Sequence, residues 1–370
     1  MPSSSIIRRP NGKWRARFRD EDGKEYARHF DRKLDGQRWL DENRALMLTG
    51  MFVSPNAGRM TFKEYAEQWR ALQVHHRPST ADAVRVSLEK RVYPRIGDKK
   101  MRSIRSDDIA AMVAELSETY KPATVTLTYS YVATIFKAAV AAREVARTPC
   151  VGIKMPEVAD ETVDPKDVLT VENVHALVKA MPEHFKPLVI LAAGTGLRQG
   201  EAFGLTRDRV NFLKREIVID RQLVMRNGKP SEFGPTKTRS SNRVIPLPQV
   251  VADALSAHIK AHEIGPEDLL FRGSRGATMR RNTFSPLWQA ATTKAGLEGY
   301  TFHALRHHYA SLLIEHGESV KVVQARLGHK SAEETLNTYA RLWPNTEDRT
   351  RQAVDAALGN VADYLRTEAS

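Results

Sequence analysis

The sequence predicts a multidomain protein that is mainly α-helical and carries small β elements. Its length of 370 residues suits two or three domains, and helical periodicity fills most of the chain beyond about residue 60. Two stretches without periodicity, around 55–58 and 151–166, have the composition of linkers. We therefore expect four parts: a small β-sheet and helix domain over 1–55, an all-helical domain over 61–150, a mixed α+β domain over 165–345 and a C-terminal tail over 346–370.

In the first domain, apolar residues at positions 14, 16 and 18 alternate with three arginines, Arg15, Arg17 and Arg19. This period of two predicts a half-buried strand with an arginine-bearing outer face. Turn chemistry at 20–23 predicts a returning strand over 24–30, and a helical pattern follows at about 34–48. The arginine face could lie in a DNA groove or be an ordinary solvated strand face, and the segment alone supports both interpretations.

The second domain has helical patterns throughout. Thr61 and Glu64 form a capping-box signature that opens its first helix. Further helical patterns follow at about 79–93, 106–118 and 122–146. No cluster of catalytic residue types lies in this region.

The third domain mixes helices with strands. Helical patterns at about 171–181 and 185–193 precede two predicted strands, 216–219 and 243–247, that flank a polar hairpin. In the tail, apolar residues at helical spacing predict a helix that packs either on a neighbouring protomer or on its own domain; they are Val354, Leu358, Val361 and Leu365.

Composition narrows the class of partner. Lysine and arginine number 57 against 44 aspartates and glutamates, a formal net charge of +13. Such a surplus attracts polyanions, which makes nucleic acid the first partner to consider, although a basic surface can also serve solubility alone. The single cysteine, Cys150, excludes an internal disulfide framework, and no apolar run reaches the length of a membrane span. With no signal-peptide pattern at the N-terminus, we expect a soluble cytoplasmic protein without membrane contact.

Two segments place basic side chains beside turns. In TGLRQGE, residues 195–201, a glycine turn delivers Arg198 to a predicted helix start, where free N–H groups and the helix dipole attract phosphate. Glu201 lies within reach of that arginine, although a solvated helix start would show the same pair. Lys237, in the polar stretch before the second strand, is either solvated or placed to donate a proton to a leaving oxygen. Lys214 and Lys229 also flank predicted strands.

Histidines and a tyrosine gather toward the C-terminus. His303 and Arg306 lie one helical turn apart on one face, and His307 follows His303 at i+4. Such a histidine pair could bind zinc, but no carboxylate ligand accompanies the two histidines. We therefore expect neither a metal nor a cofactor. Tyr339 follows His329 by ten residues, and a lone tyrosine at helical spacing more often packs than reacts.

Taken together, these groups suit one reaction. Two arginines, a lysine, two histidines and a tyrosine form an inventory for transesterification of a phosphodiester without a metal. A tyrosine has an ordinary pKa of about 10, so its attack needs proton removal and a neutralised phosphate. Without Mg²⁺, fixed cations must balance the transition-state charge, and paired arginines do this best.

Five segments resemble the catalytic domain of the tyrosine recombinases in their order and in their residue sequences. The resemblance is greatest to phage integrases with three domains. The segments are TGLRQGE, TKT before RVIPL, HALRH, LGH and NTYARL. The resemblance is strong over about 165–345. It extends more loosely over 61–150 as a core-binding domain and over 1–55 as an arm-binding domain.

The resemblance implies a role for each matched residue. Tyr339 would attack the scissile phosphate and form a 3′-phosphotyrosyl bond, while Lys237 would protonate the departing 5′-oxygen. The other matched residues would hold the phosphate or assist proton transfer: Arg198 and Arg306 on the non-bridging oxygens, His303 at the nucleophile, His329 on the phosphate and Glu201 in support. Arg15, Arg17 and Arg19 would contact arm-site DNA.

The resemblance also implies partners. It predicts a homotetramer on double-stranded DNA with core and arm attachment sites, strand exchange through a Holliday junction, and integration or excision of a phage or mobile element. A DNA-bending host factor and a directionality factor would complete the assembly. Two alternatives stay open from the residues: a type IB topoisomerase, which shares the chemistry, and a DNA-binding regulator without catalysis.

Overall fold

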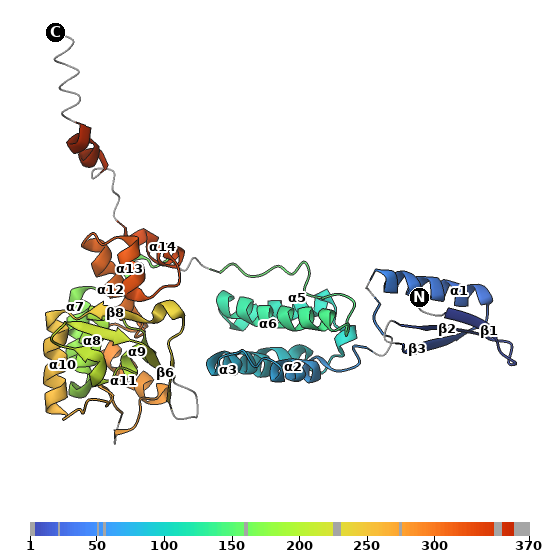
Figure 1. Ribbon diagram of the computed structural model, residues 1–370, viewed down its shortest axis with the longest axis horizontal. Helices are drawn as coiled ribbons and strands as arrows, with labels where there is room; N and C mark the ends of the chain where they lie inside the picture. The colour runs from blue at the N-terminus through green and yellow to red at the C-terminus, as the bar shows by residue number, and fades with distance from the viewer. Residues whose placement is uncertain are drawn as a thin grey trace, which may run out of the picture. The chain divides into compact units, whose positions relative to one another are not determined.

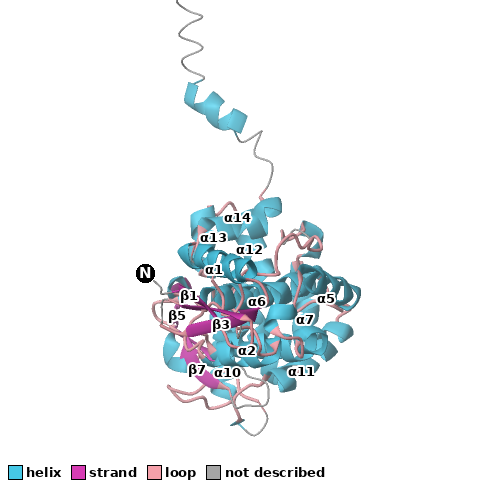
Figure 2. Ribbon diagram, turned by 90° about the vertical axis from the view of Figure 1, so that its right-hand side faces the viewer, coloured by secondary structure: helices cyan, strands magenta, loops and turns pink. Residues whose placement is uncertain are grey.

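The computed structural model describes residues 4–20, 23–49, 52–54, 57–158, 162–224, 231–273, 276–343 and 350–358. The chain divides into two compact units, Met1–Ala159 and Asp160–Ser370 (Figure 1). Helices predominate and the strands form only small sheets, which confirms the predicted fold class (Figure 2). Within the described ranges, every helix is too short or too polar for a membrane crossing.

The first unit begins with a three-stranded antiparallel sheet, β1 (Ser4–Arg8), β2 (Trp14–Arg19) and β3 (Glu25–Phe30), followed by helix α1 (Lys33–Leu48). The predicted alternation in β2 is confirmed, because Ala16 and Phe18 are buried while Arg17 and Arg19 are exposed. Helix α1 covers the apolar face of the sheet. It approaches closely because Gly36 has no side chain; a Cβ there would lie 2.7 Å from Ile6 Cδ1.

The rest of this unit is helical, with its own apolar core. The helices are α2 (Phe62–Ala71), α3 (Pro78–Ser87), α4 (Tyr93–Ile96), α5 (Ser106–Thr119) and α6 (Pro122–Ala141), and a π-helical turn at Leu88–Val92 joins α3 to α4. The capping box of Thr61 and Glu64 is present. Helix α6 ends before the predicted residue 146, since Arg143 takes a left-handed φ of 57° that a helix cannot continue.

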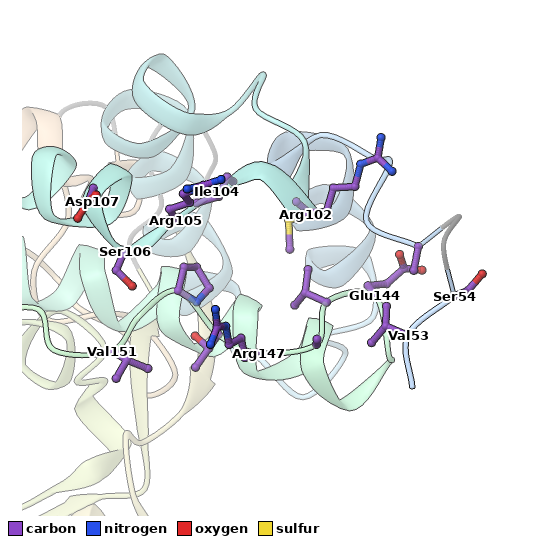
Figure 3. Close-up of a pocket in the computed structure, with 16 residues that line it drawn as sticks. Val53, Ser54, Arg102, Ile104, Arg105, Ser106, Asp107, Glu144, Arg147 and Val151 are labelled. Carbon is purple, nitrogen blue, oxygen red and sulfur yellow. The ribbon is translucent and has the colours of Figure 1, made fainter. Parts of the chain in front are cut away.

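A hollow of about 960 Å³ lies in the first unit. Three chain segments line it, and they bring Arg102, Arg105 and Arg147 to its wall (Figure 3). Glu144, also in the wall, accepts a hydrogen bond of 2.9 Å from the Gly58 backbone N–H. None of the predicted catalytic residues lines this hollow, so the candidate site lies elsewhere.

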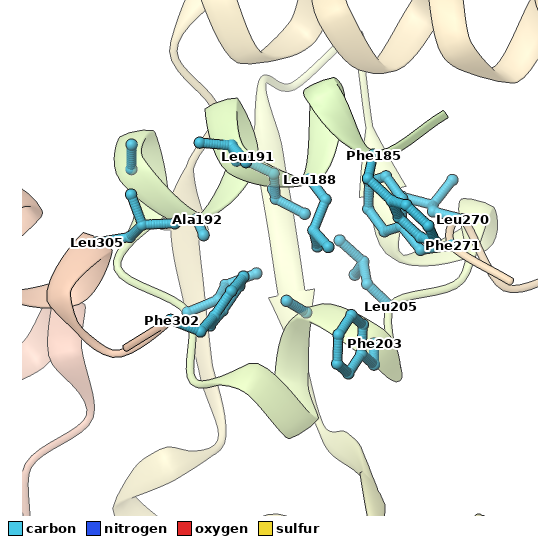
Figure 4. Close-up of a cluster of buried hydrophobic side chains, with 14 of the residues drawn as sticks. Phe185, Leu188, Leu191, Ala192, Phe203, Leu205, Leu270, Phe271, Phe302 and Leu305 are labelled. Atoms are coloured by element: carbon cyan, nitrogen blue, oxygen red, sulfur yellow. The ribbon is translucent and has the colours of Figure 1, made fainter. Parts of the chain in front are cut away.

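The second unit is built around helix α8 (Lys186–Thr195), which is apolar around most of its circumference. Helices α7 (Val171–Ala180), α10 (Gln249–Ala261) and α12 (Ala304–Glu315) pack on it. Figure 4 shows Leu188, Leu191 and Ala192 of α8 among side chains from distant segments, including Phe302 and Leu305. Burial of this helix fixes the position of its C-terminal end, where the candidate site begins.

Two small sheets lie in the second unit. Strands β4 (Val210–Asn211), β5 (Glu216–Ile219) and β8 (Arg243–Pro246) are antiparallel, while β6 (Arg221–Val224) and β7 (Glu232–Pro235) form a separate hairpin. The two predicted strands are confirmed and pair directly through the fully buried residues Ile217 and Ile245. Residues 225–230, which follow β6 in the sequence and include Lys229, lie outside the described residues.

The remaining labelled helices complete the second unit. They are α9 (Gln199–Phe203), α11 (Arg281–Lys294), α13 (Val320–Leu327) and α14 (Ala332–Tyr339), followed by a 3₁₀ turn at Ala340–Leu342. Ser331 caps α14 through the Glu334 N–H, but the Glu334 carboxylate accepts from the Lys330 N–H at 3.0 Å, so only half of a capping box forms. Residues 350–358 are helical, and Val354 and Leu358 are exposed there. Val361 and Leu365 lie outside the described residues, so docking of the tail stays a prediction.

Candidate active site

The second unit brings Arg198, His303, Arg306, His329 and Tyr339 together from the ends of four helices, α9, α12, α13 and α14. Arg198 is the N-cap of α9, His303 is the N-cap of α12, and Tyr339 is the last residue of α14. Arg306 lies in the first turn of α12, and His329 follows the glycine that ends α13. The C-terminal ends of α8 and α13 leave backbone carbonyls unpaired within the helix, and the guanidinium groups of Arg306 and Arg198 bind these carbonyls.

Arg306 is almost fully buried, with 1% of its surface exposed. Its guanidinium donates to the carbonyl of Gly196 at 2.8 Å and to the carbonyl of Leu327 at 2.7 Å. These carbonyls lie at the C-terminal ends of α8 and α13, where the helix dipole is negative and a cation is favoured. Burial and then the charge of Arg198 lower the pKa of Arg306 to about 9, so it is still a cation at neutral pH.

Both helices end on a glycine in the left-handed region. The φ angles of Gly196 and Gly328 are 63° and 67°, which other residues adopt only with strain. A Cβ on Gly196 would also lie 2.5 Å from Cδ1 of Tyr309. Glycine is therefore required at position 196 both for the backbone conformation and for the space that positions the carbonyl bound by Arg306.

Glu201 organises the second arginine. Its carboxylate accepts from the Arg198 guanidinium at 3.1 Å and from the Arg198 backbone N–H at 3.1 Å, so the contact expected from the i,i+3 spacing is present. Arg243 donates to both carboxylate oxygens, at 2.8 and 3.2 Å. Burial opposes ionisation of Glu201, but the hydrogen bonds and charges of Arg243 and Arg198 hold its pKa below the usual range. The sequence did not indicate that Arg243 belongs to the site, because it predicted this residue only as the start of a strand.

The hydroxyl of Tyr339 lies 3.0 Å from Nδ1 of His307. The ring of His329 is nearly parallel to that of Tyr339, with centroids 6.2 Å apart, and its Nδ1 lies 2.8 Å from the Thr335 hydroxyl. His303 faces solvent, and its ring centroid lies 4.7 Å from that of His307. The histidine in contact with Tyr339 is thus His307, which the sequence suggested only as a zinc ligand; its i+4 spacing from His303 was the available signal.

The electrostatics of the cluster are those of an anion-binding site. Burial raises the pKa of Tyr339 to about 12, although the charges of Arg306 and Arg198 oppose this shift. Burial and then Arg306 lower the pKa of His307 to about 4, and the same causes lower the pKa of His329 to about 4. The histidines are therefore neutral at neutral pH, and the positive charge comes from the arginines. Such a site can bind a phosphodiester and accept a proton from the tyrosine.

Lys237 lies in the turn between β7 and β8 and is exposed. In the same turn the Ser241 hydroxyl accepts from Arg198 at 3.3 Å, so the turn borders the arginine cluster. Within the described residues, the Lys237 ammonium group forms no hydrogen bond or ion pair. The structure thus brings the segment of Lys237 to the site and leaves its ammonium in solvent.

Other predicted residues lie outside this cluster. Arg15, Arg17 and Arg19 belong to the first unit, on the face of β2 opposite α1, and all three are within 3.2–3.8 Å of the Glu25 carboxylate. In the described part of the chain, His303 and His307 belong to no group of three potential metal ligands.

Acidification should destabilise the second unit. The pKa values of His307 and His329 are lowered to about 4 in the folded chain, against about 6.5 when unfolded, so protons bind preferentially to the unfolded state between these values. Stability is then fully present above about pH 6.5 and falls as the pH drops toward 4. We expect each histidine to cost on the order of 1–2 kcal/mol at about pH 5. Thermal unfolding from pH 7 to pH 5 would measure this loss.

Two variants test this prediction, His307→Gln and His329→Gln. Each should reduce the dependence of the unfolding temperature on pH. His316→Gln serves as the control because His316 is exposed at the opposite, C-terminal end of α12 and should leave the slope unchanged. An equal slope in all four proteins would contradict the assignment of the shifted pKa values to this cluster.

Comparison with protein families matches three models along the chain. Residues 5–49 match the phage integrase N-terminal domain, 62–155 match the phage integrase central domain and 167–345 match the phage integrase family. These three matches follow the order expected of a three-domain integrase.

Individual relatives agree with these matches. The chain is 27% identical over 321 residues to the integrase of Mycobacterium phage D29, covering 83% of this chain and 84% of the relative. It is 30% identical over 240 residues to a XerC-like tyrosine recombinase of Caldanaerobacter subterraneus, covering 58% of this chain and only 61% of that protein's length.

Solved structures share the fold. The Tn1549 transposon integrase in complex with transposon right end DNA aligns with a TM-score of 0.68 at 20% identity, over 81% of this chain and all of that chain. A lambda integrase tetramer bound to a Holliday junction aligns with a TM-score of 0.60 at 20% identity, over 92% of this chain and 98% of that chain. Together with the three family matches, these relatives show that the chain belongs to the phage integrase family and is a tyrosine recombinase.

Proposed function

We propose that this recombinase integrates or excises a phage genome or related mobile element by cutting and rejoining DNA through a phosphotyrosine bond at Tyr339. The observation that carries the proposal is the contact of 3.0 Å between the Tyr339 hydroxyl and His307, beside the buried Arg306. A neutral imidazole can take the phenolic proton, and a fixed guanidinium can hold the phosphate under attack.

The reaction balances without a cofactor. The Tyr339 oxygen attacks the scissile phosphorus while its proton passes to His307, with His303 next in line. The bond from phosphorus to the 5′-oxygen breaks, and Lys237 supplies the proton to that oxygen. Because the phosphotyrosyl bond keeps the energy of the phosphodiester, a 5′-hydroxyl of another strand can reverse the step and release Tyr339.

The other residues of the cluster would hold the phosphate. Arg198 and Arg306 would bind the non-bridging oxygens bidentately, and His329 would donate a hydrogen bond to one of them. Glu201 is a positioning residue that acts through Arg198 and Arg243. Tyr339 and Arg306 are each 1% exposed, so the proposal includes a movement of the segment around α14 that lets a DNA phosphate reach them.

The proposal extends to the assembly. We place four copies on two duplexes, with residues 61–150 on the core site, 165–345 at the cleaved phosphate and 1–55 on the arm site. The lambda integrase tetramer on a Holliday junction supports this arrangement by its shared fold. The protein would act in the bacterial cytoplasm, with a DNA-bending host factor and a directionality factor setting the geometry and direction of exchange.

Tyr339→Phe should abolish the covalent adduct with DNA, because the phenyl ring keeps the packing but lacks the nucleophilic oxygen. The assay incubates the protein with a nicked attachment-site duplex and separates adducts on a denaturing gel. Tyr309→Phe is the matched control, since Tyr309 is a second buried tyrosine in the same core cluster. Adduct formation by Tyr339→Phe would refute the assignment of the nucleophile.

His307→Gln should slow adduct formation by about 10²–10³-fold, the range of general base catalysis, without weakening DNA binding. Without its base, Tyr339 must ionise unaided from a pKa of about 12, so the rate of the variant should climb more steeply with pH than that of the wild type. His303→Gln is the comparison. A large loss in His303→Gln with a small one in His307→Gln would instead make His303 the base.

The arginine face of β2 is proposed to contact arm-site DNA. Glu25 lies on this face and contacts all three arginines, so it competes with phosphate for them. Replacing Arg15, Arg17 and Arg19 by alanine should weaken arm-site binding and reduce the slope of log affinity against log salt by up to about 3. Glu25→Gln should have the opposite effect and tighten binding.

Both variants are tested as full chains by titrating arm-site DNA at several salt concentrations, with core-site cleavage as the control. Cleavage of a core site should stay unchanged. Loss of core cleavage together with arm binding would contradict a separate arm-binding role for this face.

A further inference from the structure

Three histidines gather in the second unit outside the candidate active site. His184 lies in the 3₁₀ turn Glu183–Phe185, His258 lies in the last turn of α10, and His262 is the C-cap of that helix. One ligand nitrogen of each lies within 4.8 Å of those of the others. Their ring centroids are 4.6–5.2 Å apart.

The hydrogen bonds of the buried histidines leave one nitrogen of each available. Nε2 of His258 lies 2.7 Å from the carbonyl of Leu270, and Nε2 of His184 lies 3.1 Å from the carbonyl of Arg272. A carbonyl only accepts, so both Nε2 atoms carry the proton, and Nδ1 of each keeps its lone pair. Carbonyl groups fix the tautomer of metal-binding histidines in the same way.

Nδ1 of His184 lies 3.3 Å from Nε2 of His262. This contact is a hydrogen bond from His262 to the lone pair on His184. Two nitrogens bound to one tetrahedral Zn²⁺, with bonds of about 2.0–2.1 Å, are separated by about 3.4 Å. The ion would replace the shared proton at nearly the observed spacing.

The surroundings of the three histidines suit a small metal site that is buried on one side and open to solvent on the other. His258 is 4% exposed and its ring stacks on Phe271 at 5.0 Å, whereas His262 is exposed. Burial lowers the pKa of both His184 and His258, so both are neutral and able to bind a cation at neutral pH. Figure 4 shows Phe185, Leu270 and Phe271, the chain neighbours of these groups, side by side in the core.

We propose that His184, His258 and His262 form a binding site for a divalent transition metal, with Zn²⁺ as the expected ion. The ligands are Nδ1 of His184, Nδ1 of His258 and Nε2 of His262, with a water as the fourth. The ion joins the turn before α8 to the end of α10, and the hydrogen bonds of His258 and His184 connect the site to the carbonyls of Leu270 and Arg272. The site is separate from Tyr339 and independent of the proposed function.

The test titrates Zn²⁺ into the full chain, free of affinity tags, by calorimetry, with Co²⁺ absorption reporting the coordination geometry. We expect one ion per chain, visible bands of tetrahedral Co²⁺ and a higher Tm with Zn²⁺. His262→Ala should weaken binding at least about tenfold without loss of folding, because His262 is exposed. His184→Ala should do the same.

His316→Ala is the matched control, since His316 is also exposed at a helix C-cap and should bind no ion. The proposal is overturned by a wild-type chain that binds no Zn²⁺. It is equally overturned if His262→Ala and His184→Ala bind as tightly as the wild type, or if binding is lost in His303→Ala instead, which would place the ion at the His303 and His307 pair.

Discussion

The buried guanidinium of Arg306 is the constraint on which the rest of the site depends. A charge taken out of water must be compensated, and leaving it unpaired costs about 3–5 kcal/mol. Carbonyls at the ends of α8 and α13 provide this compensation, each positioned by a glycine in the left-handed region. The two hydrogen bonds of Arg306 therefore connect α8, α12 and α13. They also hold a charged guanidinium at the place where we propose that a phosphate binds.

The same cation sets the chemistry of its neighbours. Burial and then the charge of Arg306 lower the pKa values of His307 and His329 to about 4, so both imidazoles are neutral at neutral pH. Burial makes Tyr339 harder to ionise, so the proposed nucleophile would be inactive until a base and a phosphate are both in place. An enzyme that cuts DNA gains from this arrangement, because a resting chain carries no reactive phenolate.

Glu201 and Glu25 each bind more than one arginine, but with different strength. Glu201 is buried and holds Arg198 and Arg243 in fixed positions, so loss of Glu201 would remove the carboxylate that compensates both guanidinium groups. Glu25 is partly exposed, and its contacts with the β2 arginines are worth about 0.2–1 kcal/mol each. The first arrangement is a rigid site, and the second is a surface that DNA phosphates can take over.

The sequence by itself determined the fold class and most helices and strands, because these follow from local periodicity. Its short motifs, such as TGLRQGE and HALRH, also predicted most residues of the candidate site through their resemblance to the tyrosine recombinases. It could not show that Arg243 shares Glu201, since the two are 42 residues apart and meet only through the pairing of β8. Nor could it choose His307 over His303 at Tyr339. Both histidines fit the same helical spacing, and only the packing of α14 against α12 decides which imidazole reaches the hydroxyl.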